Sequence, residues 1–223
     1  DLREKLQALV LYNSRSARPG EKDGEDYHFR RREEIEKLRE DENFVVMQVR
    51  GDLQAFDLKE LHGLLKRADV LFEGNPFIGS TLLTHPKLKK VKRLSVFVSP
   101  LSRQELSFLK EQSGVDLESL VTDVMRRKLL RRMQRQKGLL SLKDLEEAER
   151  RAKSAFRELG LAHQFEHVIS NHDGEDSENW NAFYFPLGDA GKTLDTFVAL
   201  LRGQKARATE SWEKGFIASH EGS

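Results

Sequence analysis

The chain has no cysteine among its 223 residues. Disulfide bonds, thiolate nucleophiles and zinc–thiolate sites are therefore excluded as sources of stability or chemistry. Its apolar runs stay well short of the roughly eighteen residues that a membrane-spanning helix needs. No signal-like segment opens the sequence either. These absences predict a cytoplasmic protein that has no membrane partner.

An excess of charge of one sign is also missing. The 38 basic and 37 acidic side chains leave a formal net charge of +1. Dedicated nucleic-acid-binding domains usually have a strongly basic surface, so this balance argues against nucleic acid as a partner. A local basic segment at residues 126–137 leaves RNA binding open as a lesser alternative; otherwise such a segment is a solvated helix face.

Short apolar segments alternate with amphipathic ones along the chain. We expect strands at residues 9–12, 44–49, 70–72, 93–99 and 167–171, and helices at residues 32–41, 58–67, 118–136, 141–159 and 194–201. The aromatic stretch 179–187 is a candidate extension of the last strand. This alternation predicts an α/β fold with a mostly parallel sheet flanked by helices.

The most informative motif is NSRSARPGEKDGEDYHF at residues 13–29. Arg15 and Arg18 lie three residues apart on a loop that Pro19 stiffens. Two planar guanidinium groups form a fork suited to a phosphate dianion, and Tyr27 adds a hydroxyl donor. From the residues alone, the alternative is a Pro-Gly turn with solvated arginines.

This motif closely resembles the phosphate-gripping segment of guanylate kinases, which usually reads T-T-R-x-P-R-P-G-E-x-x-G-x-D-Y-x-F. Two weaker matches follow it in the chain. Residues 97–106 are similar to the family's F-I-x-P-P-S-x-E-E-L, and residues 167–173 to its strand end V-I-V-N-D-D. The resemblance covers roughly residues 9–173.

The resemblance implies a P-loop-kinase-like fold with two specialised parts. A small acceptor-binding subdomain would occupy about residues 13–60, and a helical lid with an insertion about residues 102–160. We place the whole domain at residues 1–203, followed by a polar C-terminal tail at residues 204–223.

The activity implied by the resemblance is that of a nucleoside monophosphate kinase. Such an enzyme moves the γ-phosphoryl group of ATP, with Mg²⁺ as cofactor, to GMP or a similar acceptor. Arg15, Arg18 and Tyr27 would hold the phosphate of the acceptor. Asn171 would lie near the adenine of ATP, because it matches the Asn of the family's strand end. We assign no direct protein ligand to a metal.

The lid of this family carries arginines that neutralise charge on the transferred phosphoryl group. Arg150, Arg151 and Arg157, on the helix expected after Ser141, are placed similarly. Arginines of the preceding basic helix could contribute instead, namely Arg126, Arg127, Arg131, Arg132 and Arg135. For any single one of these side chains, the alternative is a solvated helix face.

Guanylate kinases also carry a Gly-rich P-loop with Gly-Lys-Ser/Thr upstream of the arginine segment. Only about a dozen residues precede Arg15 here, so in an enzyme we expect this loop before Asp1. The alternative is a non-catalytic guanylate-kinase-like module that binds a nucleotide or a phosphorylated peptide. The sequence PLGDAGKT at residues 186–193 is P-loop-like, but Pro186 lacks the N–H that such a loop needs. We expect a helix start at Gly188 instead.

The positions that usually read guanine also depart from the family pattern. Val46 replaces a glutamate and cannot accept hydrogen bonds from guanine. Gln54 is our candidate for reading the base, whose identity stays open. Glu73 stands where the family has a pair of aspartates, so it is a candidate substrate-side or magnesium-shell carboxylate; the alternative is a loop acid. The acidic cluster at residues 172–177 is interpreted as a solvated loop; the alternative is a contact with magnesium or with a ribose.

Overall fold

The computed structural model describes residues 6–18, 20–174 and 177–217. The chain divides into two compact units, Asp1–Gly79 and Ser80–Ser223, which are described one at a time. Helix α3 (Pro76–Thr84) runs across the division. Within the described ranges, no helix is long and apolar enough to cross a membrane.

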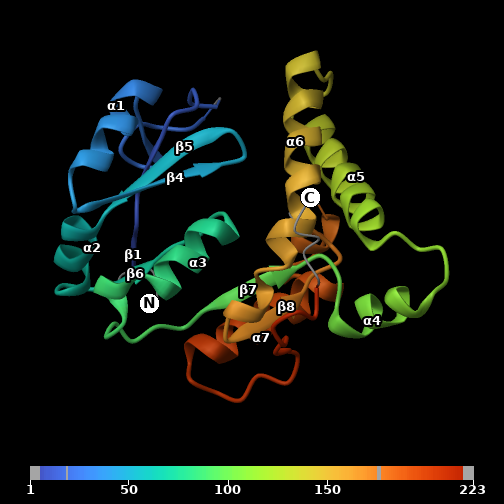
Figure 1. Ribbon diagram of the computed structural model, residues 1–223. Coiled ribbons are helices and arrows are strands. Elements are labelled where there is room, and N and C mark those ends of the chain that lie inside the picture. Colours follow the sequence, from blue (N-terminus) through green and yellow to red (C-terminus); the bar gives the residue numbers. More distant parts are fainter. Residues whose placement is uncertain (1–5, 19, 175–176, 218–223) are drawn as a thin grey trace. The chain divides into compact units, whose positions relative to one another are not determined.

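The first unit is built on a four-stranded sheet of order β3-β2-β5-β4, in which β4 and β5 lie side by side (Figure 1). Strand β2 pairs in parallel with β3, whereas β5 pairs antiparallel with both β2 and β4. The elements of this unit are β1 (Leu6–Ala8), β2 (Leu11–Asn13), β3 (Tyr27–Phe29), α1 (Arg32–Lys37), β4 (Phe44–Val49), β5 (Asp52–Asp57), α2 (Leu58–Leu65) and β6 (Asp69–Leu71).

The hairpin of β4 and β5 follows directly from the local sequence. Arg50 and Gly51 form its two-residue loop with φ of 52° and 96°, the left-handed conformation that tight hairpins require and glycine adopts readily. Strand β4 has the predicted bounds. Ile35 of α1 is fully buried against Leu53 and Ala55 of β5, so the helix covers one face of this sheet.

Strands β1 and β6 form a separate parallel pair. The strand predicted at residues 9–12 is in fact two short strands, β1 and β2, which belong to different sheets. Leu9 lies in the break, where its N–H donates to the carbonyl of Leu71 at 2.9 Å. A buried apolar run can therefore connect two sheets as well as form one strand.

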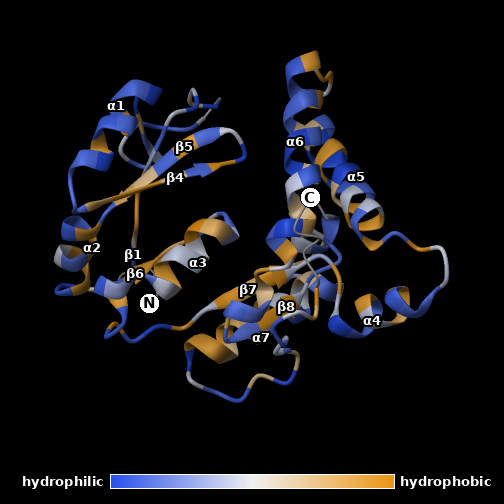
Figure 2. Cartoon of the chain, viewed as in Figure 1, coloured by the Kyte–Doolittle hydropathy of each residue, from blue (hydrophilic) through white to orange (hydrophobic). Residues whose placement is uncertain are grey.

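The second unit combines a parallel strand pair with a long helical hairpin (Figure 1). Its elements are β7 (Val96–Ser99), α4 (Arg103–Glu111), α5 (Leu117–Lys137), α6 (Leu142–Leu159), β8 (His167–Ser170) and α7 (Gly188–Leu201). Figure 2 shows hydrophobic residues gathered on β7, in contrast to long hydrophilic stretches on α6. The parallel strands flanked by helices agree with the predicted fold class.

Helix α6 begins with the cap that the sequence predicts. The hydroxyl of Ser141 accepts from the N–H of Asp144 at 3.3 Å, while the carboxylate of Asp144 accepts from the N–H of Ser141 at 2.9 Å. This reciprocal pair satisfies two N–H groups that a helix start leaves free. The cap fixes where α6 begins after the break at Gly138, so it sets where the chain turns between α5 and α6.

The segment following α7 packs into the core of the second unit. Trp212 and Ile217 are only 4% and 6% exposed, and they lie in one cluster with Phe97 and Phe156. Glu210 exchanges two backbone hydrogen bonds of 2.8 Å with Val168 of β8. Residues 210–217 are thus part of the fold rather than the polar tail that the composition predicts; residues 218–223 lie outside the described ranges.

The aromatic stretch after β8 does not extend the strand. Residues 178–180 form a 3₁₀ turn, Glu178–Trp180, and α7 begins at Gly188, six residues before the helix that the apolar pattern alone predicts at 194–201. The rings of Phe183 and Phe185 contact each other at 5.2 Å between centroids while remaining more than half exposed. An aromatic-rich sequence alone does not distinguish a strand from a solvent-facing loop.

The P-loop-like sequence begins a helix, as expected. Gly188 starts α7, and Lys192 is exposed and pairs with Asp189 at 3.2 Å. Gly188 has a φ of +56°, and a Cβ there would lie 2.8 Å from Nδ2 of Asn179. Glycine is therefore needed here, because the start of α7 and the segment before it lie too close together for a side chain.

Substituting Gly188 with alanine is expected to destabilise the second unit by about 1–3 kcal/mol, from backbone strain plus this contact. Gly203→Ala is the matched control, because its φ of +66° is similar but no atom lies within 4 Å of its Cβ position. Thermal unfolding of both variants checks the prediction. Equal losses of stability would show that the contact with Asn179 contributes nothing.

Candidate functional site

Arg15 and Glu21 form a bidentate ion pair across the arginine loop. Nη1 and Nη2 of Arg15 each donate to one carboxylate oxygen of Glu21 at 2.6 Å. Both side chains are less than one-fifth exposed. A planar guanidinium matched to two oxygens is among the stronger polar contacts in proteins. The pair therefore fixes the guanidinium of Arg15 in one orientation.

Two aromatic rings hold the same guanidinium from β3. Its carbon lies 5.1 Å from the ring centroid of Tyr27 and 5.3 Å from that of Phe29. Such cation–π contacts favour a cation that has lost part of its hydration. Arg15 and Tyr27, which the sequence assigns to one phosphate site, are thus brought together by the structure.

Glu21 also organises the backbone around Arg18. Its carboxylate accepts from the N–H of Arg18 at 2.7 Å, and its own N–H donates to the carbonyl of Arg18 at 3.0 Å. The Arg18 side chain is exposed, whereas Pro19 lies outside the described residues. A single carboxylate therefore shapes the loop that presents both arginines.

The hydrogen bond from Arg15, the largest of several causes, lowers the pKa of Glu21 below its ordinary value. A lowered pKa means that the ionised form is favoured in the folded state. The contribution of Glu21 to stability is therefore complete above its ordinary pKa and is lost as pH falls through the lowered one. The loop should keep its shape at neutral pH.

The sheet anchors the start of this loop. Asn13, at the end of β2, is almost fully buried and accepts from the N–H of Arg15 at 3.1 Å. Ser14 accepts from the N–H of Leu53 at 2.8 Å, which ties the loop to β5. Gln54 lies opposite Asn13 in the register of β2 and β5, and it directly follows Leu53, whose N–H bonds Ser14. Gln54 thus belongs to the same sheet region as the arginine loop.

The other acceptor-side positions differ in their surroundings. Val46 is half-buried in β4 and packs beside the core of the first unit. Glu73 is exposed just after β6, on the sheet that does not carry Gln54. The structure gives no contact that joins Glu73 to the arginine loop within the described residues.

In the second unit, Asn171 directly follows β8. Its N–H donates to the carbonyl of Ser99 at 2.8 Å, and its carbonyl accepts from Nζ of Lys128 at 3.3 Å. Its side-chain oxygen accepts from the N–H of Asp173 at 3.2 Å. The strand end is therefore joined to β7, to α5 and to the loop that follows it.

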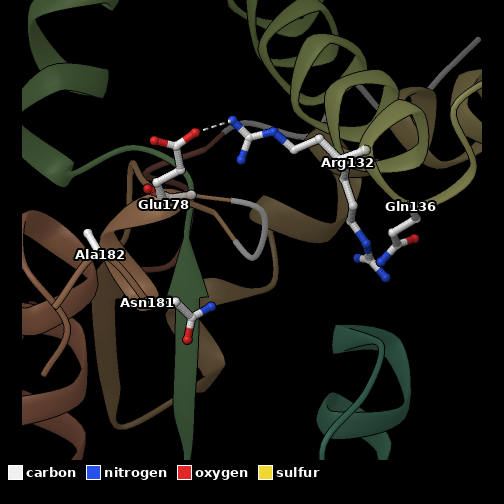
Figure 3. A pocket seen from close by; sticks show the side chains of 7 residues that line it. Arg132, Gln136, Glu178, Asn181 and Ala182 are labelled. Atoms are coloured by element: carbon white, nitrogen blue, oxygen red, sulfur yellow. Dashed lines mark hydrogen bonds and ion pairs between the residues drawn. The ribbon is translucent and has the colours of Figure 1, made fainter. Parts of the chain in front are cut away.

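Farther along α5, two arginines line a pocket of about 520 Å³ with the loop after β8 (Figure 3). Arg135 pairs with Glu178 at 3.3 Å. The lining residues are Arg132, Arg135, Gln136, Ser177, Glu178, Asn181 and Ala182. Two guanidinium groups, a hydroxyl and amides are the donors that an anionic, hydrogen-bonding ligand would use.

The arginines predicted on α6 do not line this pocket. Arg150 and Arg157 are exposed and form no ion pair with the residues that the structure describes, while Arg151 is half-buried. All three lie on the helix that packs along α5 (Figure 1). The hairpin of α5 and α6 thus carries arginines on both of its helices.

No protein-family model matches the chain. The guanylate kinase of Schizosaccharomyces pombe is 30% identical over 130 residues, which are 56% of this chain and 60% of that protein. The crystal structure of guanylate kinase from Anaplasma phagocytophilum superposes with a TM-score of 0.50 at 22% identity, covering 93% of this chain and 81% of that one. The chain contains a guanylate-kinase-like domain.

This finding confirms the predicted resemblance and the P-loop-kinase-like fold. The chain spans about three-fifths of the length of the curated relative that it matches. The reaction and the substrates of such kinases are therefore proposals for this chain.

Within the guanylate-kinase-like domain, two basic side chains of α5 pair with acidic residues of α5 and α6. Arg126 donates to Glu149 of α6 at 2.6 Å and also bonds Asp123. Lys137 bonds Asp144 near the start of α6, and this hydrogen bond is the main cause that lowers the pKa of Asp144. Such pairing argues against α5 as a free basic surface for RNA.

Protein ligands for Mg²⁺ were sought among the described residues of the guanylate-kinase-like domain. No group of three or more His, Asp or Glu side chains is arranged to hold a metal ion among residues 6–18, 20–174 and 177–217. The carboxylate of Asp173 is already bonded by Ser177, Asn179 and the N–H of Ala190. Among the described residues, the structure thus shows no preformed cluster of three such ligands, whereas Mg²⁺ commonly uses one or two carboxylates together with substrate phosphates.

Glu21 is the functional residue that sequence reasoning left without a role. It belongs to the Pro-Gly-Glu part of the motif, so a signal was available. A carboxylate beside two arginines is easily taken for solvated charge. Its partner is evident only in the folded loop, where Arg15, six residues away, lies within 2.6 Å of the Glu21 carboxylate.

Proposed function

We propose that the guanylate-kinase-like domain serves a nucleoside monophosphate kinase, which transfers the γ-phosphoryl group of ATP to GMP or a similar acceptor. The observation that carries the proposal is the arrangement of Arg15, Glu21 and Arg18. A guanidinium fixed by a carboxylate and two rings is already oriented before an anion binds, which reduces the entropy lost on binding.

On the acceptor side, Arg15 and Arg18 would bind the phosphate of the nucleotide and Tyr27 would add its hydroxyl. Glu21 would act through the arginines, since it holds one guanidinium and the backbone of the other. Gln54 offers an amide that both donates and accepts, so it can read a base that Val46 cannot. The acceptor class is therefore a nucleoside monophosphate whose base is left open.

On the donor side, Asn171 would contact the base of ATP and arginines of the lid would bind its phosphates. Phosphoryl transfer depends mainly on positioning and on neutralising negative charge. Arg132 and Arg135 already line a pocket, and Arg150, Arg151 and Arg157 extend the positive charge along α6. Mg²⁺ would arrive with ATP and neutralise phosphate charge when bound.

One specific observation favours a non-catalytic module as the second candidate. The P-loop-like sequence within the described chain begins α7 at Gly188 and contains Pro186, so it does not form a phosphate-binding loop. Together with Val46, this supports a guanylate-kinase-like module that binds a nucleotide or a phosphorylated peptide through Arg15 and Arg18.

A coupled phosphotransfer assay on the full-length protein separates the two candidates. ATP is offered with GMP, AMP, CMP and UMP in turn, and ADP production is followed. Turnover with any acceptor supports the kinase and excludes the non-catalytic module. Absence of turnover, combined with calorimetric binding of GMP or a phosphopeptide that Arg18→Ala abolishes, supports the module instead.

A further inference from the structure

Three elements of the second unit meet at His172, two residues beyond β8. Its Nε2 lies 2.8 Å from Oε2 of Glu105 in α4, and its Nδ1 bonds Oδ2 of Asp189 in α7. Glu105 also accepts from the N–H of Ser102 at 2.7 Å, which caps α4. One side chain therefore joins the start of α4 and the start of α7 to the end of β8.

This geometry requires the charged form of the ring. A neutral imidazole has one donor and one acceptor nitrogen, whereas both nitrogens of His172 face carboxylate oxygens. Partial burial opposes the charge, but the hydrogen bonds to Glu105 and Asp189 outweigh it and raise the pKa of His172. We call His172 with its two carboxylate partners, Glu105 and Asp189, the clasp. The clasp is complete at lower pH, where His172 is protonated, and it is lost as pH rises through the raised pKa of His172.

Other charged groups around the clasp have partners of their own. Lys192 of α7 bonds the second oxygen of Asp189 at 3.2 Å. Lys128 of α5 bonds the residue before His172, with its Nζ 3.3 Å from the carbonyl oxygen of Asn171. The carboxylate of Asp173 accepts from the N–H of Ala190 at 2.7 Å. His172 is thus the cation that directly bridges Glu105 and Asp189.

The clasp lies at the apex of a turn that orients Asn171. The side-chain oxygen of Asn171 accepts from the N–H of Asp173 at 3.2 Å, and Asp173 is tied to α7 through Ala190. His172 stands between these two residues. Fixing His172 therefore fixes both ends of the hydrogen bond that sets the direction of the Asn171 amide.

The residue type at this position sets the chain apart from the pattern that it resembles. Guanylate kinases usually have an aspartate after the corresponding asparagine, as in V-I-V-N-D-D. An aspartate here would place a third carboxylate beside Glu105 and Asp189, where like charges repel. The bridge between Glu105 and Asp189 therefore depends on a histidine where the family pattern has an aspartate.

We propose that His172 is a positioning residue for the donor nucleotide. Bonded to Glu105 and Asp189 as an imidazolium, it holds the turn that directs the amide of Asn171 toward the base of ATP. The proposal deepens the proposed function and rests on it only for the identity of the ligand. The local part, that His172 sets the orientation of Asn171, stands on the contacts alone.

Nuclear magnetic resonance of the nucleotide-free protein tests the local part. The side-chain amide signals of Asn171 are expected to shift with pH at the same midpoint as the ring of His172. In His172→Gln these signals should stay near their high-pH position at every pH. His167→Gln, at the start of β8, is the control and should behave as the wild type. Asn171 signals that ignore the His172 midpoint, or that are unchanged in His172→Gln, overturn the proposal.

Calorimetric binding of ATP over the same pH range tests the ligand. ATP itself titrates near neutral pH, so the compared quantity is the ratio of variant to wild-type Kd. We expect His172→Gln to bind ATP about fivefold more weakly than wild type below the midpoint, a typical coupling between linked sites, and equally above it. A ratio of one at every pH overturns donor positioning. If no variant binds ATP while Asn171 still follows His172, the kinase function fails and the local role of His172 remains.

Discussion

Arg18→Ala is expected to raise the acceptor KM of the guanylate-kinase-like domain by about ten- to a hundredfold, with little change in stability. Hydrogen bonds to a charged group contribute about 1.5–3 kcal/mol each, which corresponds to this range. Arg18 is exposed, so truncating its side chain leaves no buried cavity. Initial rates at varied acceptor and saturating ATP measure the effect.

Arg15→Ala is expected to raise the acceptor KM at least as much, and in addition to destabilise the loop. Its removal leaves Glu21 partly buried without its bidentate partner, and an uncompensated carboxylate is costly. Comparing the two variants separates phosphate binding from loop shape. The KM effect should be common to both, and the loss of thermal stability should belong to Arg15→Ala.

Arg30→Ala is the matched control for both arginine variants. Arg30 directly follows the same motif and pairs with Asp23 at 3.0 Å on the surface. Exposed pairs of this kind contribute little to stability, and nothing places Arg30 at the phosphate. Its acceptor KM should equal that of the wild type. An unchanged acceptor KM in both Arg15→Ala and Arg18→Ala would contradict the assignment of these arginines to the acceptor phosphate, whatever the overall activity.

Local sequence patterns predict the regular elements of this fold well. The reciprocal cap of Ser141 and Asp144, the break at Gly138 and the alternating apolar positions give α5, α6, β4 and β8 within about a residue at most ends. These features depend on hydrogen bonds and side-chain periodicity within a few residues. The resemblance then orders the elements into a known fold, which the structural comparison confirms.

Features that depend on distant partners were not predictable in the same way. His172 lies in an acidic stretch that looks solvated, and its partner Glu105 is 67 residues away in the chain. The exposed aromatics of residues 183–185 look like a strand because propensity ignores what covers a side chain. The candidate lid arginines also divide between α5 and α6 according to how the hairpin packs, which a loose alignment cannot determine.

The C-terminal segment also depends on distant partners that its local sequence does not reveal, and substituting its tryptophan is expected to reduce stability strongly. Residues 204–217 read as polar, yet Trp212 fills the core of the second unit at 4% exposure. Its Nε1 donates to Glu210 at 2.8 Å, and the same carboxylate accepts from the N–H of Arg103 at the start of α4. The indole therefore joins the hydrophobic core to a polar contact with another helix.

Trp212→Ala is expected to lower the free energy of unfolding by about 3–5 kcal/mol, the usual range for removing a large buried aromatic side chain. Denaturant unfolding followed by circular dichroism measures the loss. Trp180→Ala is the matched control, since Trp180 is only half-buried and its Nε1 bonds one carbonyl, that of Gly174; a clearly smaller loss is expected.

Trp212→Phe separates packing from the polar contact. Phenylalanine keeps most of the apolar volume but cannot donate to Glu210, so it should recover part of the loss seen with alanine. Phe216 would keep its place over Arg103, whose guanidinium carbon lies 5.1 Å from that ring. If Trp212→Ala is no less stable than Trp180→Ala, the segment is not part of the core. A large loss instead means that residues 210–217 stabilise the unit that carries Asn171 and the candidate lid arginines.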